Sequence, residues 1–159
     1  MVRTILTYPD PCLSAKAAPV ARMDDGVRKL IDDMFETMYS ASGFGLAAPQ
    51  IGEGRRVIVI DVSPVEKDVP PMALVNPEIV AHRGSCEATE GCLSVPGVEG
   101  VVVRPEFVTV KGLNELGDAV RFEAGGLLAR ALQHEIDHLD GVLFIDRLSS
   151  AAAATSTTK

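Results

Sequence analysis

The sequence lacks the features that mark membrane and exported proteins. It has no uninterrupted apolar stretch long enough to cross a bilayer, which takes about 20 residues. Residues 1–11 also lack a basic segment followed by an apolar run, the pattern of a secretory signal. We therefore expect a cytoplasmic protein that has no membrane partner.

Basic residues are fewer than acidic ones. The chain has 15 Lys and Arg against 22 Asp and Glu, a formal net charge of −7. No stretch gathers the basic residues into a stripe that would neutralise a phosphate backbone. This charge pattern argues against direct binding of nucleic acid.

Cysteine is too scarce for a disulfide framework. Cys12, Cys86 and Cys92 are an odd count in a chain of 159 residues, which is long enough to fold around one hydrophobic core. Disulfide frameworks belong mainly to smaller, secreted domains. We expect unpaired thiols in a reducing cytosol, with at least one thiol available for chemistry.

The hydrophobic pattern predicts two helices separated by strands. Apolar residues recur at spacings of three and four from residue 27 to residue 38, after a capping Asp24 or Asp25. A second helix should begin near Gly125 or Gly126. The other predictions are strands at 57–62, 72–80 with an interruption at Asn76, 101–113 and 119–123, a helix end at Gly141, and a short last strand at 142–145.

This order of elements predicts an α+β fold, because strands and helices do not alternate regularly. We expect mixed or antiparallel sheets packed around the second helix, with the first, amphipathic helix near the N-terminus. Residues 1–148 should form a single domain. Residues 149–159 are almost all Ala, Ser and Thr, and we expect them to form a disordered, low-complexity tail.

The strongest motif is His134-Glu135-Ile136-Asp137-His138, which lies in the predicted second helix. Two histidines four residues apart project to the same side of a helix and can share one metal ion. Glu135 lies between them and can reach a water on that metal without being a ligand. A chance pattern on a solvated helix is the alternative interpretation of this motif alone.

A catalytic metal usually takes three protein ligands and leaves one position for water. The stretch after His138 offers only Asp140, which points away from the histidine face, so the third ligand must come from elsewhere. The upstream segment Glu90-Gly91-Cys92-Leu93-Ser94 can present Cys92 to a metal. Taken alone, this segment favours an ordinary buried cysteine, since a free Cys commonly packs as a small hydrophobic residue.

A third segment, Gly43-Phe44-Gly45-Leu46-Ala47-Ala48-Pro49-Gln50, is on its own compatible with a simple helix-to-strand turn. Together and in this order, however, the three segments resemble the peptide deformylases. The signatures of that family are a Gly-x-Gly-Leu-Ala-Ala-x-Gln segment, a Glu-Gly-Cys-Leu-Ser segment and a His-Glu-x-x-His helix. The resemblance runs from the N-terminal arm to about Leu148.

The resemblance implies a metal-dependent hydrolase that removes the formyl group from the N-terminal formyl-methionine of newly synthesised proteins and releases formate. It implies that Cys92, His134 and His138 bind the metal and that Glu135 is the general acid and base. It also implies that the side-chain amide of Gln50 and the backbone N–H of Leu93 stabilise the carbonyl oxygen as it becomes negative.

Further roles follow from the same resemblance. The substrate backbone is expected to pair with the region from Gly43 to Gly45 and with Gly91. The methionine side chain is expected to enter an apolar pocket lined by Phe44, Leu127 and Ala131. Glu90 and Arg104 are expected to pair with each other and to hold the segment that carries Cys92 in place.

The identity of the metal is where general rules and the resemblance differ. One thiolate and two imidazoles suit zinc, whereas the resemblance implies ferrous iron. We expect one Fe²⁺ per chain, with Zn²⁺, Ni²⁺ or Co²⁺ as possible substitutes.

The implied partners are N-formylmethionyl nascent chains, met by a monomer in transient proximity to the ribosome. The Ala/Ser/Thr tail stands where many bacterial relatives continue into a basic C-terminal helix, which puts stable ribosome docking in doubt. Arg130 and residues 96–100 look closest to the organellar and cyanobacterial branch. The source is thus left open between a bacterium, a phage acting in its host's cytoplasm, and an organelle after removal of a transit peptide.

Two other functions fit part of the sequence. The helix motif alone is adequate for a metalloprotease, although Cys92 and the missing downstream ligand argue against that class. A catalytically silent protein that binds N-termini should have lost Glu135 or a metal ligand, and all four residues are present.

Overall fold

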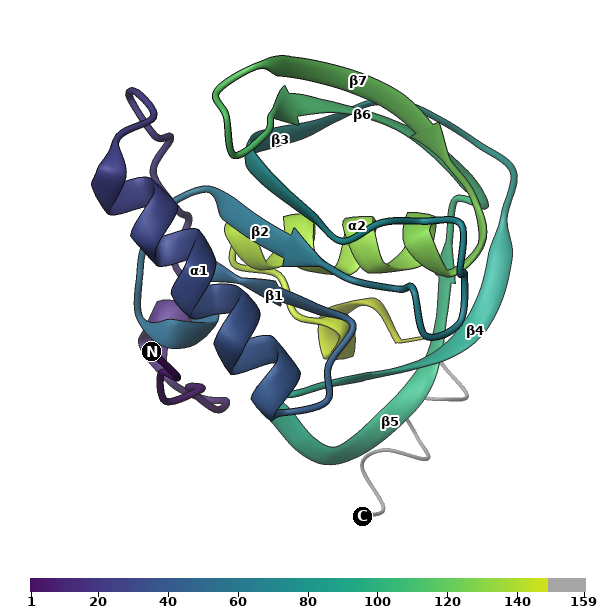
Figure 1. The fold of residues 1–159 in the computed structure, drawn as a ribbon. Coiled ribbons are helices and arrows are strands. Elements are labelled where there is room, and N and C mark those ends of the chain that lie inside the picture. The colour runs from purple at the N-terminus through teal and green to yellow at the C-terminus, as the bar shows by residue number, and fades with distance from the viewer. Residues whose placement is uncertain (149–159) are drawn as a thin grey trace.

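Two helices lie on opposite faces of one antiparallel sheet (Figure 1). The computed structural model describes residues 1–148 and contains helix α1 (Asp25–Ser40) and helix α2 (Gly126–Leu139). Neither helix in this range has the length and the apolar surface that spanning a bilayer requires.

The larger sheet has five strands in the order β1-β2-β3-β6-β7, and every neighbouring pair is antiparallel. A separate antiparallel pair, β4-β5, forms a second sheet. The predicted α+β fold with antiparallel sheets is therefore confirmed. The strands are β1 (Gly45–Ala47), β2 (Val57–Ile60), β3 (Met72–Arg83), β4 (Cys86–Cys92), β5 (Val95–Arg104), β6 (Phe107–Leu113) and β7 (Ala119–Ala124).

Strand β2 shows why the sheet is covered on both sides. All four of its residues are buried, and successive side chains of a strand point to opposite faces. Ile58 and Ile60 pack in the cluster that contains α2, whereas Val57 and Val59 pack in the cluster that contains α1. The continuous apolar run of β2 thus reflects burial on both faces.

The first helix forms as the sequence predicts. Asp24 is its N-cap, and the Asp24 carboxylate accepts a hydrogen bond of 2.9 Å from the backbone N–H of Val27. The apolar face contributes Leu30, Ile31 and Met34 to the core. The helix ends at Ser40, before the glycines that follow.

The predicted interruption at Asn76 is a bulge and does not end the strand. Asn76 has a positive φ of 52°, and the pairing of β3 with β6 shifts register between Val75 and Glu78. The Asn76 side chain also binds the backbone N–H and C=O of Val20, at 2.8 and 2.9 Å. The strand then continues to Arg83.

A single strand over residues 101–113 is wrong. Residues 95–104 form β5, and a new strand, β6, begins at Phe107. Pro105 lies between them, has no backbone N–H and cannot continue a ladder. The strands predicted on either side of residues 114–118 do pair with each other, as β6 and β7.

The C-terminal part of the described chain differs from the prediction of a short strand at 142–145. Residues Phe144–Arg147 form a 3-10 helix, and the Asp146 carboxylate accepts the backbone N–H of Leu143 at 3.0 Å. Helix α2 ends at Leu139, two residues before the predicted Gly141. The predicted disordered tail, 149–159, lies outside the described residues.

The N-terminal arm is fastened to α1 through Asp33. This carboxylate is buried and accepts hydrogen bonds from the Met1 ammonium at 2.9 Å and from Arg3 Nη2 at 2.9 Å. The hydrogen bonds from the ammonium and from Arg3 lower the pKa of Asp33 to about 2, against the opposing effect of burial. The charged form of Asp33 therefore stabilises the folded state.

The effect of Asp33 on stability should depend on pH. Asp33→Asn should lower the free energy of unfolding at pH 7 by about 2 kcal/mol, because hydrogen bonds to a charged group are lost. The difference from wild type should shrink as pH falls from the ordinary carboxyl pKa of 3.8 towards about 2, where the wild-type carboxylate takes up its proton. Urea unfolding of both proteins across this pH range measures the difference in the free energy of unfolding. Asp32→Asn, at an exposed neighbour, is the control, and a difference that stays constant with pH would contradict the prediction.

Candidate active site

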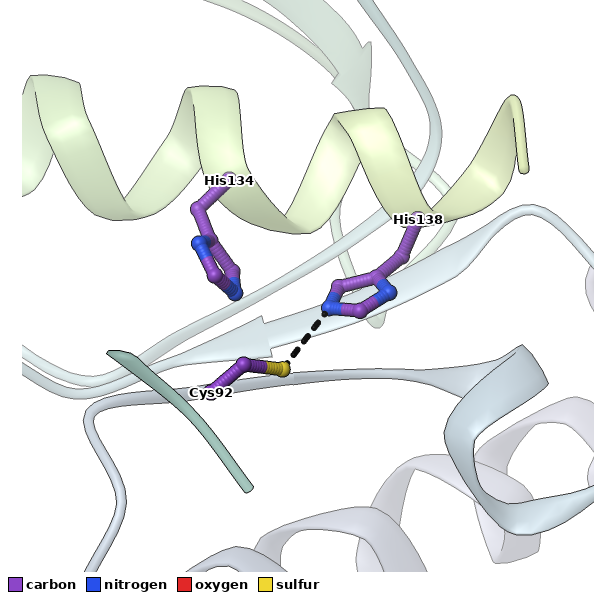
Figure 2. Close-up of side chains that lie close together, drawn as sticks. All are labelled: Cys92, His134 and His138. Atoms are coloured by element: carbon purple, nitrogen blue, oxygen red, sulfur yellow. Dashed lines mark hydrogen bonds between the residues drawn. The ribbon is translucent and has the colours of Figure 1, made fainter. Parts of the chain in front are cut away.

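Three potential metal ligands converge between α2 and β4. His134 and His138 lie one turn apart on α2, and both rings point towards Cys92 (Figure 2). The Cys92 Sγ lies 3.3 Å from the His138 Nε2, and the ligand atoms of all three residues lie within 4.8 Å of one another. The structure thus brings together the three side chains that the sequence singled out.

Cys92 is the last residue of strand β4. A two-residue turn follows, and Cys92 pairs with Val95 at the start of β5. The Cys92 Sγ accepts from the backbone N–H of Ser94 at 3.4 Å and from the Gln50 Nε2 at 3.7 Å. The turn therefore surrounds the sulfur with donors and holds it facing α2.

The donor set fits a transition-metal ion. One sulfur and two imidazole nitrogens are ligands of the soft and borderline class. Burial lowers the pKa of His138 to about 3, which keeps its ring in the neutral form that binds metals. Burial also opposes a charge on His134, yet Glu135, Cys92 and Glu90 outweigh it and raise its pKa to about 10. The surroundings of His134 thus favour a positive charge.

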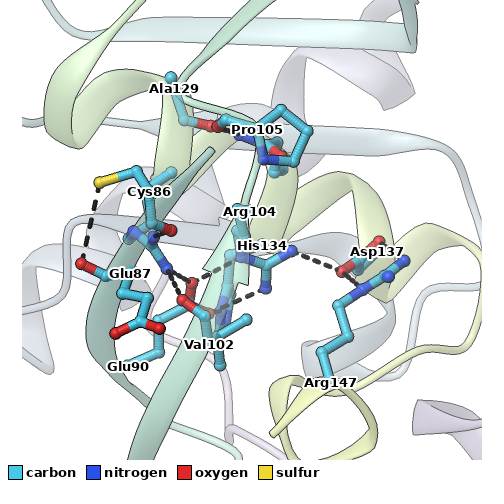
Figure 3. A network of polar contacts seen from close by, with 12 residues as sticks. Cys86, Glu87, Glu90, Val102, Arg104, Pro105, Ala129, His134, Asp137 and Arg147 are labelled. Atoms are coloured by element: carbon cyan, nitrogen blue, oxygen red, sulfur yellow. Dashed lines mark hydrogen bonds and ion pairs between the residues drawn. The ribbon is translucent and has the colours of Figure 1, made fainter. Parts of the chain in front are cut away.

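Glu90 is the centre of a polar network beside the three ligands (Figure 3). Its carboxylate accepts from Arg104 Nη2 at 2.8 Å, from Arg130 Nη1 and from His134 Nδ1 at 3.1 Å. The contact to Nδ1 leaves the Nε2 of His134 on the side of Cys92. Burial raises the pKa of Glu90, but the hydrogen bonds from Arg104 and His134 prevail and lower it to about 2.

The predicted pair of Glu90 and Arg104 is present, and the hydrogen-bond network continues from Arg104 to a later turn of α2. Arg104 is 4% exposed and also donates from Nη1 to Asp137 at 2.9 Å. Asp137 in turn accepts from Arg147 Nη2 at 2.9 Å. Strands β4 and β5 are thereby connected to two turns of α2 and to the 3-10 helix that follows.

Glu135 is a buried acid that lies against strand β1. It is 5% exposed, and its Oε1 has no hydrogen-bond partner among residues 1–148. Burial raises the pKa of Glu135 to about 7. A Cβ added at Gly45 would lie 2.7 Å from the Glu135 Oε2, so only glycine allows β1 to approach this closely.

Gln50 is held at three points in the wall of the site. Its Oε1 accepts from the backbone N–H of Ala47 at 2.9 Å, and its Nε2 donates to the Ser94 Oγ at 3.1 Å. The remaining contact of Nε2 is the long one to the Cys92 Sγ. The amide is 1% exposed and has a fixed orientation towards the ligands.

A pocket of about 740 Å³ opens beside these residues. Glu135, Gln50 and Leu93 line it together with Cys92 and His134. Phe44 is 40% exposed and therefore contributes to its rim. The residues predicted to bind substrate all lie in its wall: Gly43, Phe44, Gly45, Gly91, Leu127 and Ala131.

Sequence reasoning did not assign site roles to Ser94, Arg130 and Asp137. Ser94 is fully buried and orients Gln50, and Arg130 links Glu90 to the backbone carbonyls of Val102 and Cys86. Ser94 and Asp137 lie inside two of the recognised motifs, and this place in the sequence was the available signal that they belong to the site. The contacts of Arg130 depend on strands far away in the sequence and left no local pattern.

Comparisons with known proteins agree with this geometry. The model of the family described as "Polypeptide deformylase" matches residues 2–154. A peptide deformylase of Thermodesulfovibrio yellowstonii is 52% identical over 91% of this chain and 88% of its own length. A peptide deformylase of Natranaerobius thermophilus is 53% identical over 92% of each chain.

Solved structures give the same result. The crystal structure of a peptide deformylase from Legionella pneumophila has a TM-score of 0.91 and 48% identity, and covers 100% of this chain and 93% of its own. A peptide deformylase from Synechococcus elongatus, solved in complex with actinonin, has a TM-score of 0.90 and 44% identity, and covers 97% of this chain and 85% of its own.

Replacing Glu90 should destabilise the protein strongly. Glu90→Gln leaves Arg104 buried beside a neutral amide, and breaking a buried ion pair typically costs about 3–5 kcal/mol. The loss should be visible as a lower denaturant midpoint in urea unfolding. Glu87→Gln, at an exposed position of the same strand, is the matched control. Equal stability of the two variants would show that the network contributes little.

Proposed function

We propose a site for the reaction of this chain, which belongs to the polypeptide deformylase family and removes the formyl group from the N-terminal formyl-methionine of newly synthesised proteins. The reaction takes place in the pocket between β1, β4 and α2, with one metal ion held by Cys92, His134 and His138. The observation that carries this proposal is the convergence of these three ligands beside a pocket lined by Cys92, His134 and Glu135. The Glu135 Oε1 has no hydrogen-bond partner among residues 1–148.

The proposed metal is ferrous iron. When bound, the ion supplies a Lewis acid that activates water and polarises the formyl carbonyl. The chain's own contribution is to fix the ligands: Glu90 orients the ring of His134, and the backbone N–H of Ser94 orients the Cys92 sulfur. The Glu90–Arg104 pair supports this arrangement and takes no part in the chemistry.

Glu135 is the proposed general acid and base. Its Oε1 is buried and uncommitted among residues 1–148, so it can accept a proton from the attacking water. As the bond between the formyl carbon and nitrogen breaks, the same oxygen returns the proton to the leaving nitrogen. Formate and a free N-terminal amine are the products.

The carbonyl oxygen that becomes negative needs donors that are already in place. We assign this role to the Gln50 Nε2 and to the backbone N–H of Leu93. Ala47 and Ser94 anchor the Gln50 amide, and among residues 1–148 its second N–H makes only the 3.7 Å contact to the Cys92 Sγ. This weak contact can be exchanged for the substrate oxygen without rotation of the amide.

The pocket provides for recognition of the residue that carries the formyl group. Leu127 and Ala131 on α2, with Phe44 at the rim, form an apolar wall suited to a methionine side chain. The main chain of residues 43–45 and Gly91 are the proposed partners of the peptide backbone. The protease and the silent binding protein receive no support from the relatives, which are peptide deformylases.

Several expectations accompany this function. We propose that residues 1–148 form the whole catalytic domain and that the protein acts in the cytoplasm, where formylated chains are made. Bacterial relatives support the second statement. A monomeric state and transient proximity to the ribosome stay predictions.

Glu135→Gln should lower kcat for formate release from formyl-Met-Ala-Ser by about 10²- to 10⁴-fold, because the proton acceptor is lost. The Glu135→Gln protein should still bind the metal, since Glu135 is not a ligand. Formate release measures the loss of kcat, and metal analysis measures the retained metal binding. A variant that retains full activity would exclude Glu135 as the base, and cleavage of unformylated internal peptide bonds by wild type would revive the protease.

Loading the protein anaerobically with Fe²⁺ should give faster formate release than loading with Zn²⁺, and removal of the metal by a chelator should abolish release. His138→Ala should retain far less metal after dialysis, because one of three protein ligands is lost. Metal analysis of the dialysed proteins is the readout, with His82→Ala as control, since His82 is exposed and lies outside the cluster. Equal activity with both metals would overturn the preference for iron.

A further inference from the structure

Helix α2 carries a wall of the pocket at its start and the metal ligands near its end. A displacement of the helix along its axis would move both. Its first turn has no side-chain cap of its own, because the N-cap residue is Gly125 and no side-chain hydrogen bond is made there. The free N–H groups of a helix start need acceptors from another part of the chain.

Glu66 supplies these acceptors from 61 residues away. The Glu66 Oε2 accepts the backbone N–H of Leu127 at 3.1 Å, and the Oε1 accepts that of Leu128 at 3.1 Å. A carboxylate at this end also complements the helix dipole. The approach depends on Gly126, because a Cβ there would lie 2.4 Å from the Glu66 Oε2.

The position of Glu66 is itself well defined. It ends a turn that follows β2, in which the backbone N–H groups of Val65 and Glu66 both donate to the C=O of Val62, at 2.9 and 2.8 Å. Val62 is fully buried in the cluster that packs against α2. The carboxylate therefore projects from an anchored turn.

The opposite end of α2 is held by Arg56, the residue just before β2. Its Nη1 donates to the C=O of Leu139 at 2.9 Å, and its Nη2 pairs with Asp140 at 3.0 Å. A cation at the C-terminus and an anion at the N-terminus both suit the helix dipole. The segments that flank one central strand thus fix both ends of the metal-binding helix.

We propose that Glu66 is a positioning residue for substrate selection. By holding the N–H groups of Leu127 and Leu128, it fixes the first turn of α2 and with it the apolar wall that Leu127 and Ala131 present to the pocket. Its loss relaxes that wall and weakens discrimination by side-chain size. The inference rests on the proposed role of this wall in binding the methionine side chain.

The test compares formate release from formyl-Met-Ala-Ser and formyl-Ala-Ala-Ser by wild type, Glu66→Ala and Glu66→Gln. The ratio of kcat/KM for the two peptides does not depend on the fraction of active enzyme, so partial unfolding cannot change it. In Glu66→Ala the ratio should fall by at most about thirtyfold, the factor reached if all the free energy of a lost helix cap were taken from binding of the methionine side chain. The fall should arise mainly from a higher KM for the methionine peptide.

Glu66→Gln keeps one acceptor oxygen and should give a smaller fall, and it serves as the test if Glu66→Ala does not fold. The control is Glu78→Ala, which removes an exposed carboxylate paired with Lys111 at 3.7 Å and should leave the ratio unchanged. An unchanged ratio in both Glu66 variants would overturn the inference. Failure of the proposed function itself would look different, because wild type would then release no formate from either peptide.

Discussion

The carboxylate of Glu90 is the interaction on which the site depends. It is 7% exposed and receives two arginines and a histidine, which come from β5 and from two successive turns of α2. A buried charge is costly unless it is paired and hydrogen-bonded. Because these partners are also buried or nearly so, removing any one of them leaves buried polar groups with fewer hydrogen bonds. The strand that carries Cys92 and the helix that carries the two histidines are therefore held in one relative position.

The hydrophobic layers provide the frame in which this polar network can form. Strand β2 is covered by a helix on each face, and the strand beside it, β1, carries the glycine that lies against Glu135. The small sheet is fixed by a third cluster, which includes Val95, Val102 and Phe144. Close packing in such cores resists small displacements. The relative positions of Gln50, Cys92 and Glu135 thus depend on these apolar layers as well as on the hydrogen bonds within the site.

Features of the fold and the site could be predicted from the sequence where residues close together in the chain carried the signal for them. The helix at Asp25–Ser40 follows from apolar spacing and a cap, and the spacing of His134 and His138 follows from helix geometry. The break at Pro105 had a local signal, a proline without a backbone N–H, that the strand prediction did not use. The continuation of β3 through Asn76 required knowledge of strand partners. The capping of α2 by Glu66 could not be read at all, because its partners are backbone N–H groups that carry no sequence signature. Cys92 was recognised only through three segments considered together.

The contact between Gly45 and Glu135 also limits which amino-acid substitutions the protein can accept at position 45. Even the methyl group of alanine at position 45 would intrude on the carboxylate, so a substitution there would displace the Glu135 side chain. A mutation that escapes an inhibitor usually works by altering a side chain that the inhibitor touches. A compound that draws its affinity from the main chain at this position would contact a surface that the protein has no simple means of altering.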